Sequence, residues 1–573
     1  NLPLKNHNLH WASLFVDALA QSGLTAVIIS PGSRSTPLTL AFDAHPAIET
    51  FVHLDERGAG FFGLGMAIAS DKPVALVCTS GTAVANYLPA IVEAQMSQVP
   101  LLILTGDRPH ELRHSGANQT IDQVKIFGDQ VLWSVDMALP EADAPEVAQR
   151  NVCTTAVRAY ATANGLRKGP AHVNFPFRKP LEPEDSDRYS VFSIHNSQFT
   201  IHNWERGTLL PTNEQMNWLT AVFSQHPRGL IICGPRCPSG DFPAAVTALA
   251  QHIGYPILAD SISGVRFNQG KFTAKNAKKK SAESLIISGY ETFLQSDPGW
   301  PKPEVIVRFG TVPTSKWLNN YLDGIQPKIR LHIRENGVWA DDSHRTTHFL
   351  QLNETAVCQQ LLSKLSKREN GEWVTAVTQT DQTCWKHLQA ALTDKYFDGA
   401  IVADVVELIP EDATLFMGNS SPVRHLEQYG RFQPKQLTTH ANRGASGIDG
   451  NLATALGIYA ASKRPLVAIV GDITFFHDMN SLLLIKNSAS SAQSSTASLR
   501  LNKNITIVLL HNDGGSIFNR LPIAQLEPPF TELFLTPHGL DFEPVCRMFG
   551  LDYIRADSRE AFRTAFAASV QDN

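Results

Sequence analysis

The sequence has no strong excess of charge of either sign. Lys and Arg together number 49 against 54 Asp and Glu, which leaves a net charge of −5. This balance creates no general basic field, so nucleic acid is not an expected partner. The one concentrated basic stretch, residues 271–280, holds five lysines and is expected to be a solvated loop.

Cysteine is scarce, and long apolar runs are missing. The seven cysteines are an odd, scattered set that indicates no disulfide framework, and Cys233 and Cys237 have no second pair to complete a zinc site. No apolar run approaches the roughly 18 residues needed to cross a bilayer. The first residues lack the basic-then-apolar order of a secretory signal. We therefore expect a soluble protein in the reducing cytoplasm.

Short runs of Val, Ile and Leu recur along the chain. Each run ends in Gly, Ser, Thr, His or Asp and leads into a helix-like stretch; the runs are residues 26–29, 74–78, 101–104, 230–233, 466–470 and 505–510. Strands buried on both faces read as continuous apolar runs, so the pattern predicts an α/β fold with parallel sheets. Ligands of such sheets bind at the carboxyl ends of the strands. No Gly-x-Gly-x-x-Gly directly follows these runs and no Gly-Lys-Ser/Thr loop occurs, which disfavours dinucleotides and nucleoside triphosphates.

Two polar stretches divide the chain into units of similar size. Residues 179–187 are proline-rich and acidic, and residues 363–372 are polar throughout. The prediction is three doubly wound parallel-sheet domains, at residues 1–182, 190–365 and 372–573. A Ser- and Ala-rich segment, residues 487–504, is expected to be a surface insertion in the last domain.

Polar residues follow two neighbouring apolar runs of the last domain. Gly471 and Asp472 close one run, and Asn512, Asp513 and Gly514 close the next. A carboxylate, an amide oxygen and a backbone carbonyl form a half-shell of hard oxygen ligands, which suits Mg²⁺ that also binds phosphate oxygens. For either motif alone, a helix cap or a plain turn remains the alternative.

The ordered pair resembles the thiamine diphosphate signature of the decarboxylase and acyloin-synthase superfamily. Members of that superfamily also need a glutamate in the first domain, and Glu56 stands at that place. Five segments are further similar to the 2-succinyl-5-enolpyruvyl-6-hydroxy-3-cyclohexene-1-carboxylate synthase family: residues 30–37 (SPGSRSTP), 105–109 (TGDRP), 116–119 (GANQ), 442–450 (NRGASGIDG) and 512–518 (NDGGSIF). The resemblance implies a pyrimidine-binding, a central and a diphosphate-binding domain.

The resemblance also implies a reaction and a cofactor site. Family members condense 2-oxoglutarate with isochorismate and release carbon dioxide, in menaquinone or phylloquinone biosynthesis. Glu56 would be catalytic, because it hydrogen-bonds the aminopyrimidine of thiamine diphosphate and favours its imino form. Ile448 would prop the bent cofactor, Ser420 would contact it, and Asp472, Asn512 and Gly514 would hold Mg²⁺ or Mn²⁺.

Both substrates are dicarboxylates, which planar guanidinium groups bind in fixed orientation. The implied substrate-binding residues are Ser33, Arg34, Arg108, Asn118, Gln119, Lys316, Arg424, Arg443 and Phe518. The resemblance places the first domain of one chain against the third domain of another, in a homodimer or a dimer of dimers. An isolated monomer is then expected to be inactive.

Two other functions remain open. The chain could be another thiamine diphosphate-dependent carboligase or decarboxylase of the acetohydroxyacid synthase type, although the pocket arginines argue against an apolar acceptor. It could also be a non-catalytic cofactor-binding protein, although the complete set of Glu56, Asp472 and Asn512 argues against that.

Overall fold

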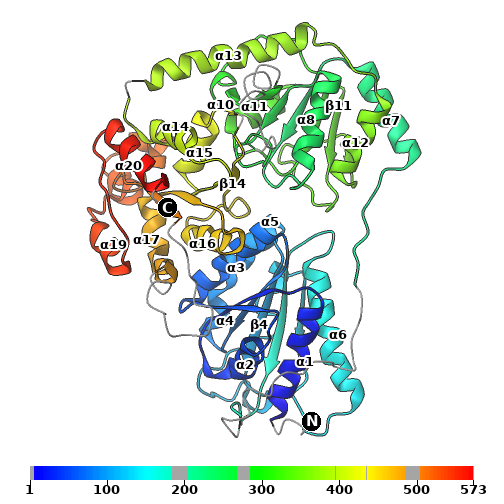
Figure 1. Cartoon of the computed structure of the whole chain (residues 1–573), viewed down its shortest axis with the longest axis vertical. Helices are drawn as coiled ribbons and strands as arrows, with labels where there is room; N and C mark the ends of the chain where they lie inside the picture. Colours follow the sequence, from blue (N-terminus) through cyan, green and yellow to red (C-terminus); the bar gives the residue numbers. More distant parts are fainter. Residues whose placement is uncertain are drawn as a thin grey trace.

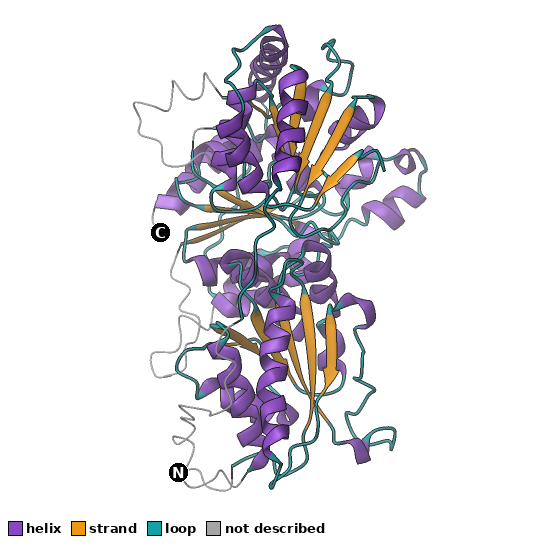
Figure 2. Ribbon diagram, turned by 90° about the vertical axis from the view of Figure 1, so that its right-hand side faces the viewer, coloured by secondary structure: helices purple, strands orange, loops and turns teal. Residues whose placement is uncertain are grey.

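The computed structural model describes residues 6–183, 204–267, 284–393, 395–433, 435–485 and 504–571. The chain forms three domains, each built around one parallel sheet with helices on both faces (Figures 1 and 2). The predicted α/β class and the three doubly wound sheets are confirmed. The basic stretch at 271–280 and nearly all of the Ser- and Ala-rich segment lie outside the described residues. No described helix is long and apolar enough to span a bilayer.

The first domain contains a six-stranded sheet of order β2-β1-β3-β4-β6-β5. Every pair is parallel; for example, Val77 of β3 pairs with Leu104 of β4. Its elements are α1 (His7–Gln21), β1 (Ala26–Ile29), η1 (Ser33–Ser35), α2 (Thr36–Asp43), β2 (Glu49–Val52), α3 (Glu56–Ser70), β3 (Val74–Cys78), α4 (Thr82–Asn86), α5 (Leu88–Ser97), β4 (Leu101–Asp107), η2 (His110–Leu112), η3 (Gly128–Gln130), β5 (Trp133–Asp136), α6 (Glu146–Ala163) and β6 (Pro170–Pro176).

The middle domain has a second six-stranded parallel sheet, of order β12-β11-β10-β7-β8-β9. Its elements are α7 (Asn213–Gln225), β7 (Gly229–Cys233), α8 (Phe242–Ile253), β8 (Ile257–Ala259), β9 (Ile286–Ile287), α10 (Tyr290–Phe293), β10 (Val305–Phe309), α11 (Lys316–Gly324), β11 (Ile329–Ile333), β12 (His348–Leu350) and α12 (Glu354–Lys364).

The third domain has a parallel sheet whose four described strands follow the order β14-β13-β15-β16. Its elements are α14 (Asp398–Leu408), β13 (Thr414–Met417), α15 (Ser421–Tyr429), β14 (Thr438–His440), α16 (Asn451–Ser462), β15 (Leu466–Gly471), α17 (Asp472–Asp478), η5 (Met479–Leu482), β16 (Ile505–Leu510), η6 (Ser516–Arg520), η7 (Pro522–Gln525), η8 (Thr531–Leu535), α19 (Glu543–Phe549) and α20 (Arg559–Gln571).

Helix α13 (Glu372–Leu392) runs along the top of Figure 1 and joins the middle domain to the third. Its first turns bury Trp373, Val374 and Val377 in a core cluster of the middle domain. The indole N–H of Trp373 also donates to the carbonyl of Gly229 at the start of β7. The helix that opens the predicted third domain is therefore partly anchored in the middle one, and the boundaries themselves stay a prediction.

The first and third domains meet where α3 packs on α16. The helices approach so closely that a Cβ on Gly65 would lie 2.0 Å from the carbonyl oxygen of Thr454, and one on Gly457 would lie 2.0 Å from that of Phe62. Glycine in a helix interior costs about 1 kcal/mol relative to alanine. Here that cost is offset by contact between the two backbones and by the apolar core they share.

A buried ion pair joins the middle and third domains. The Arg266 guanidinium lies 3.1 Å from a carboxylate oxygen of Glu427 on α15, and both side chains are almost fully buried. The Tyr290 hydroxyl contacts the same carboxylate, and the backbone N–H of Ser261 donates to its other oxygen. Helix α15 is thus fixed to the middle domain by charge that is neutralised inside the protein.

Candidate active site

Several predicted residues of the first domain gather around Ser80, beyond the carboxyl end of β3. The Arg108 guanidinium donates to the Ser80 hydroxyl at 3.1 Å and to the carbonyl of Asn118 at 3.0 Å. The Gln119 side-chain amide donates to the Ser80 carbonyl, and the Ser80 hydroxyl donates to the Gln119 carbonyl. The structure therefore brings three predicted residues from two separate loops together at one sheet edge.

Arg34 lies at the same edge, in the short turn η1 that follows β1 and begins at Ser33. Its side chain is 6% exposed, and one guanidinium nitrogen donates to the carbonyl of Phe177. The buried Nε has no hydrogen-bond partner among the described residues. Burial, and next the positive charge of Arg108, lower the pKa of Arg34. The chain thus holds two guanidinium groups close together against their mutual repulsion.

Glu56 is the first residue of α3, which is capped by the Asp55 side chain. It is half-buried and lies at the carboxyl end of β2, since only residues 53–55 separate that strand from α3. Its negative charge contributes to the raised pKa of both Cys78 and Tyr87. In both groups burial is the larger cause of the raised pKa. The predicted catalytic carboxylate therefore stands at the edge that carries Arg34 and Arg108.

The two predicted metal-binding strand ends of the third domain are hydrogen-bonded to each other. Asp472 is 2% exposed, and its Oδ2 accepts the backbone N–H of Asn512 at 3.1 Å and that of Gly514 at 3.0 Å. The other carboxylate oxygen accepts the N–H of Ile473. Asp472 thus sits between β15 and β16, although Asn512 lies 40 residues further along the chain.

The chemistry of these residues fits a hard divalent cation and a diphosphate. The Asn512 side-chain nitrogen is directed to Asp398 at 3.3 Å, which leaves the amide oxygen as its ligand atom. A Cβ on Gly471 would meet no atom within 4 Å, whereas one on Gly514 (φ +132°) would meet the carbonyl oxygen of Leu535 at 2.1 Å. Open space beside Gly471 and three kinds of oxygen donor are what such a group requires.

The other predicted residues of the third domain lie on α15, η6 and the loop of residues 441–450. Arg443 donates to the side-chain oxygen of Asn419 at 3.0 Å, and Ile448 follows in the same loop. Arg424 donates to the carbonyl of Ser420, whose own side chain does not cap α15. Phe518 lies in η6, and its ring packs on Phe534.

Lys316 is the one predicted site residue from the middle domain. It is the first residue of α11 and is exposed, with its ammonium group 5.7 Å from the centre of the Trp317 ring. No hydrogen bond or ion pair among the described residues links it to the other predicted site residues, so its role stays a prediction.

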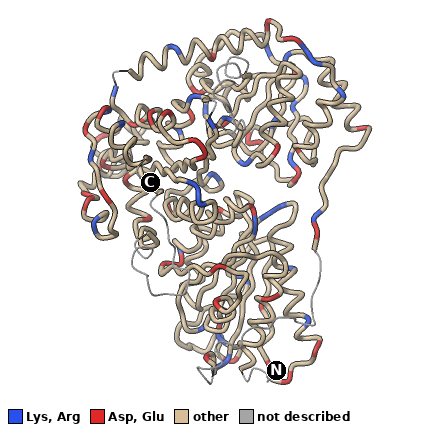
Figure 3. The backbone as a smooth tube through the Cα atoms, viewed as in Figure 1, with Lys and Arg blue, Asp and Glu red and all other residues tan. Residues whose placement is uncertain are grey.

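The four predicted arginines have no carboxylate within ion-pair distance among the described residues. None of Arg34, Arg108, Arg424 and Arg443 forms an ion pair with an acidic side chain in the described ranges, although all are buried or half-buried. Burial lowers the pKa of both Arg424 and Arg443, and the charge of Arg443 lowers that of Arg424 further. Figure 3 shows Lys and Arg positions along the boundary between the first domain and the other two.

Within one chain, the two halves of the predicted site remain separate. No hydrogen bond or ion pair of the described residues joins the group at Glu56, Arg34 and Arg108 to the group at Asp472 and Asn512. The neighbours of Glu56 instead contact the far end of α17, since Arg57 donates to the carbonyl of His477 and Asn480 donates to Asp55.

Three residues that the sequence did not single out lie beside the predicted ones. His538 Nε2 lies 3.3 Å from Asp472, and its Nδ1 accepts the N–H of Leu540. Arg520 lowers the pKa of Arg424, and Asp398 contacts Asn512. Asp472, His511 and His538 also place ligand atoms within 4.8 Å of one another. The only local signal for His538 is its position between a proline and a glycine.

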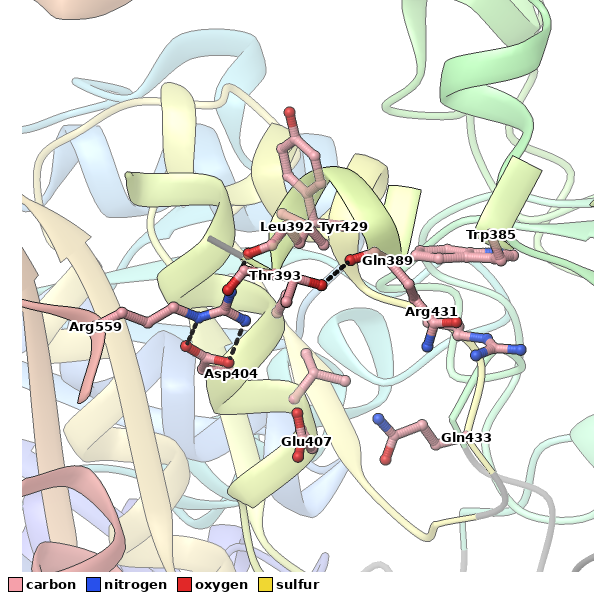
Figure 4. A pocket seen from close by; sticks show the side chains of 12 residues that line it. Trp385, Gln389, Leu392, Thr393, Asp404, Glu407, Tyr429, Arg431, Gln433 and Arg559 are labelled. Carbon is pink, nitrogen blue, oxygen red and sulfur yellow. Dashed lines mark hydrogen bonds and ion pairs between the residues drawn. The ribbon is translucent and has the colours of Figure 1, made fainter. Parts of the chain in front are cut away.

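A separate polar pocket of about 260 Å³ lies between α13, α14 and α20. Figure 4 shows its walls, where Arg559 forms a two-point contact with the buried Asp404. No predicted site residue lines it. This pocket is therefore distinct from the two sheet edges described above.

Three family models of thiamine pyrophosphate enzymes match most of the chain. Residues 9–126 match the family described as "Thiamine pyrophosphate enzyme, N-terminal TPP binding domain", residues 195–417 match "Middle domain of thiamine pyrophosphate", and residues 418–573 match "Thiamine pyrophosphate enzyme, C-terminal TPP binding domain".

Curated relatives extend the match over nearly the full length. The chain is 50% identical to the 2-succinyl-5-enolpyruvyl-6-hydroxy-3-cyclohexene-1-carboxylate synthase of Roseiflexus sp. (strain RS-1), over 99% of this chain and 94% of the relative. It is 38% identical to the protein of the same name from Bacillus cytotoxicus, over 97% and 90%. The crystal structure of benzoylformate decarboxylase from Polynucleobacter necessarius superposes with a TM-score of 0.69 at 16% identity, over 98% of this chain and 96% of that one. This last likeness concerns the fold alone.

Proposed function

Because the chain belongs to the 2-succinyl-5-enolpyruvyl-6-hydroxy-3-cyclohexene-1-carboxylate synthase family of thiamine pyrophosphate enzymes, we propose that it joins 2-oxoglutarate to isochorismate with loss of carbon dioxide. It is a thiamine diphosphate-dependent enzyme of the transferase class. The reaction adds the succinyl-semialdehyde unit of the oxoacid to the acceptor. Its product would enter menaquinone or phylloquinone biosynthesis in the cytoplasm.

One observation carries the choice of substrates: four arginines at the two sheet edges have no acidic ion-pair partner among the described residues. Elsewhere in the chain, the buried Arg266 pairs with Glu427 and the buried Arg308 pairs with Asp341. The buried Arg330 and Arg334 form no such ion pair among the described residues, but their guanidinium groups donate to backbone carbonyls. Unpaired guanidinium groups in a cleft attract anions, and their planar geometry fits carboxylates. Two dicarboxylic substrates supply that charge, whereas pyruvate and an apolar acceptor supply much less.

The residues of the two edges suit complementary parts of the cofactor. Thiamine diphosphate supplies, when bound, a carbon nucleophile that also accepts the electrons released by decarboxylation. Glu56 would hold a proton at the aminopyrimidine end, and Ile448 would support the middle of the molecule. Asp472, Asn512 and Gly514 would hold Mg²⁺ or Mn²⁺ at the diphosphate end, with Ser420 beside it. Arg34, Arg108, Arg424 and Arg443 would orient the substrate carboxylates, with Ser33, Asn118, Gln119, Phe518 and Lys316 around them.

The active assembly would contain two copies of the chain, since the halves of the site do not meet within one. Apolar side chains near both halves support this proposal: Val52, Leu54 and Phe476 are 51%, 64% and 50% exposed. Exposed apolar groups close to a functional edge are typical of a surface that another subunit covers. Glu56 of one copy would then face Asp472 of the other.

The test is a spectrophotometric assay of isochorismate consumption with 2-oxoglutarate, thiamine diphosphate and Mg²⁺, each omitted in turn. We expect turnover only in the complete mixture, and none when pyruvate replaces 2-oxoglutarate. Turnover of pyruvate without isochorismate would instead support an acetohydroxyacid synthase or decarboxylase activity.

A variant separates catalysis from cofactor binding. Glu56→Gln removes the carboxylate but keeps the size of the side chain, so activity should fall by roughly 10²–10⁴-fold. Thiamine diphosphate binding, measured by calorimetry with Mg²⁺ present, should largely persist. If activity survives the substitution, the catalytic role of Glu56 is wrong.

A further inference from the structure

A buried carboxylate of the first domain holds the loop of the third domain that carries Arg443 and Ile448. Glu93 lies in α5 and is 3% exposed. Its Oε1 accepts the backbone N–H of Gly444 at 2.7 Å, and its Oε2 accepts those of Ala445 at 2.7 Å and Ser446 at 3.3 Å. Three consecutive amides of one domain thus converge on a single side chain of another.

The opposite side of this loop is fixed from within the third domain. The side-chain amide of Asn419 donates to the carbonyls of Asn442 and Gly447, and that of Asn451 donates to the carbonyls of Gly447 and Asp449. With its carbonyls held in this way, the loop presents its N–H groups to Glu93. Only the N–H side depends on the neighbouring domain.

A carboxylate suits this position better than a neutral side chain would. All three loop groups are donors, and the Ser97 hydroxyl donates to Oε1 as well. A side-chain amide could accept on one atom only, and its NH₂ would face N–H groups. No Lys, Arg or His forms an ion pair with Glu93 within the described part of the chain, so these hydrogen bonds are its direct polar contacts in the interior, and the charges of Arg443 and Arg236 act on it from further away.

The hydrogen bonds between Glu93 and the amides of residues 444–446, called the latch below, also affect a residue of the proposed substrate pocket. Arg443 directly precedes Gly444, and the charge of Glu93 raises the pKa of Arg443 against the larger effect of burial. Ser446 has φ +61°, a left-handed conformation that residues with a side chain adopt uncommonly. The hydrogen bond from its N–H to Glu93 helps to hold the loop in this conformation.

We propose that Glu93 is a positioning residue of the active site. By binding the amides of residues 444–446, it fixes the distance between the first domain and the loop and thereby sets the places of Arg443 and Ile448. The proposal rests on the proposed function for the roles of those two residues. Helix α5 contributes no group to the chemistry, but through Glu93 it would control the substrate side of the pocket.

The experiment compares Glu93→Gln with wild type in the full-length, cofactor-loaded enzyme. Loss of charge-assisted hydrogen bonds to buried amides should lower kcat/KM by roughly 10- to 100-fold, with KM for the substrate bound by Arg443 rising. Hydrogen exchange of a peptide covering residues 443–449 should speed up by a similar factor. In Glu93→Gln combined with Arg443→Lys, the loss should be much less than the product of the two single losses.

Two further variants keep the test decisive if Glu93→Gln folds poorly. Gly444→Ala disturbs the same hydrogen bonds from the loop side, because its Cβ would lie 2.9 Å from Glu93 Oε1 and 2.7 Å from Ser97 Oγ. It should reproduce the same kinetic pattern. Glu354→Gln is the matched control: this buried carboxylate accepts the N–H of Glu335 inside the middle domain, and its loss should leave KM and loop exchange unchanged.

The possible outcomes distinguish failure of the Glu93 proposal from failure of the proposed function. Unchanged loop exchange and an unchanged KM in both Glu93→Gln and Gly444→Ala would overturn the latch while wild-type turnover stands. If the wild-type enzyme consumes no isochorismate, the proposed function fails, and faster loop exchange in Glu93→Gln would still support the latch. Fully independent effects of Glu93→Gln and Arg443→Lys would show that Glu93 acts on stability alone, against the proposal.

Discussion

The third domain contacts the other two domains through interfaces of different kinds, one of close steric packing and one with a buried ion pair. Against the first domain, α16 packs on α3 through glycines whose neighbours leave no room for a Cβ. Against the middle domain, α15 is held by the buried pair of Arg266 and Glu427. The first interface is specified by shape and the second by charge.

Each interface supports one part of the proposed site. The loop of residues 441–450 lies at the first interface, where Glu93 binds its amides. Helix α15, which carries Arg424, lies at the second. The same sheet edge is therefore positioned from two sides, by close backbone contact on one side and by a buried ion pair on the other. The two should therefore fail in different ways.

The greatest loss of stability is expected when the packing of α16 on α3 is disrupted. Gly457→Val places side-chain atoms where the carbonyl of Phe62 lies, so α16 and α3 must separate. We expect a loss of about 5 kcal/mol or more in unfolding free energy, or no folded protein. Denaturant unfolding followed by circular dichroism measures it. Gly324→Ala, a helical glycine with open space around it, is the control and should be nearly neutral; equal losses in both would remove the steric argument.

A smaller loss of stability is expected when the buried ion pair of Arg266 and Glu427 is broken. Glu427→Ala leaves Arg266 buried without its carboxylate, which should cost about 3–5 kcal/mol of unfolding free energy. The double variant Arg266→Met with Glu427→Leu removes both charges and should recover most of that loss. Thermal and denaturant unfolding of the three proteins gives the answer. No recovery in the double variant would mean that shape, and not charge, dominates here too.

A third variant tests the proposed contact with a second copy without changing either interface within the chain. Leu54→Glu places a charge on an exposed apolar position near Glu56, so it should weaken self-association by roughly 10- to 100-fold in dissociation constant, about 1–3 kcal/mol. Both interfaces within the chain should stay intact. Analytical ultracentrifugation measures the association, and activity should fall with dilution more steeply than in wild type. A variant that is monomeric and fully active would contradict the two-copy site.

Another expected effect concerns the pH dependence of stability at the interface of charge. Burial, and next the charge of Glu427, raise the pKa of Asp260 from its usual 3.8 to about 7. The folded state then binds more protons than the unfolded state between about pH 4 and pH 7, so this group makes the protein less stable as pH rises through that window. Asp260→Asn lacks the effect. Its Tm should rise relative to wild type from pH 4 to pH 7 and then level off, whereas a constant difference would refute the assignment.

Much of the fold follows from local sequence. Strands buried on both faces need apolar side chains throughout, so the runs at residues 74–78 and 466–470 coincide with β3 and with β15 up to its last residue. Shorter or edge strands leave no such signal: β9 spans only Ile286–Ile287, and β5 (Trp133–Asp136) includes a serine and an aspartate. The polar strand ends that begin at Asp472 and Asn512 were also predictable, because they directly follow such runs.

The parts of the site that depend on distant partners could not be predicted in this way. Glu93 stands in a helix between Val92 and Ala94, where a glutamate is usually solvent-exposed, and its partners lie more than 350 residues away. His538 reaches Asp472 through irregular chain that carries no periodic pattern. From the sequence, Glu427 is expected on the surface of an amphipathic helix, and only the structure shows that Arg266 packs against it. In each case the side chain gains its role from tertiary contacts.

The latch has a consequence for how the chain is made. Glu93 and Gly444 are separated by 351 positions. A ribosome that adds roughly 5–20 residues per second needs roughly 20–70 s to deliver the loop after the helix has emerged. During that interval Gly65 of α3 lacks the helix that packs on it, and Glu93 lacks the three loop amides that donate to it. Chaperone occupancy on stalled nascent chains should therefore be highest between the completion of β6 and the emergence of α16.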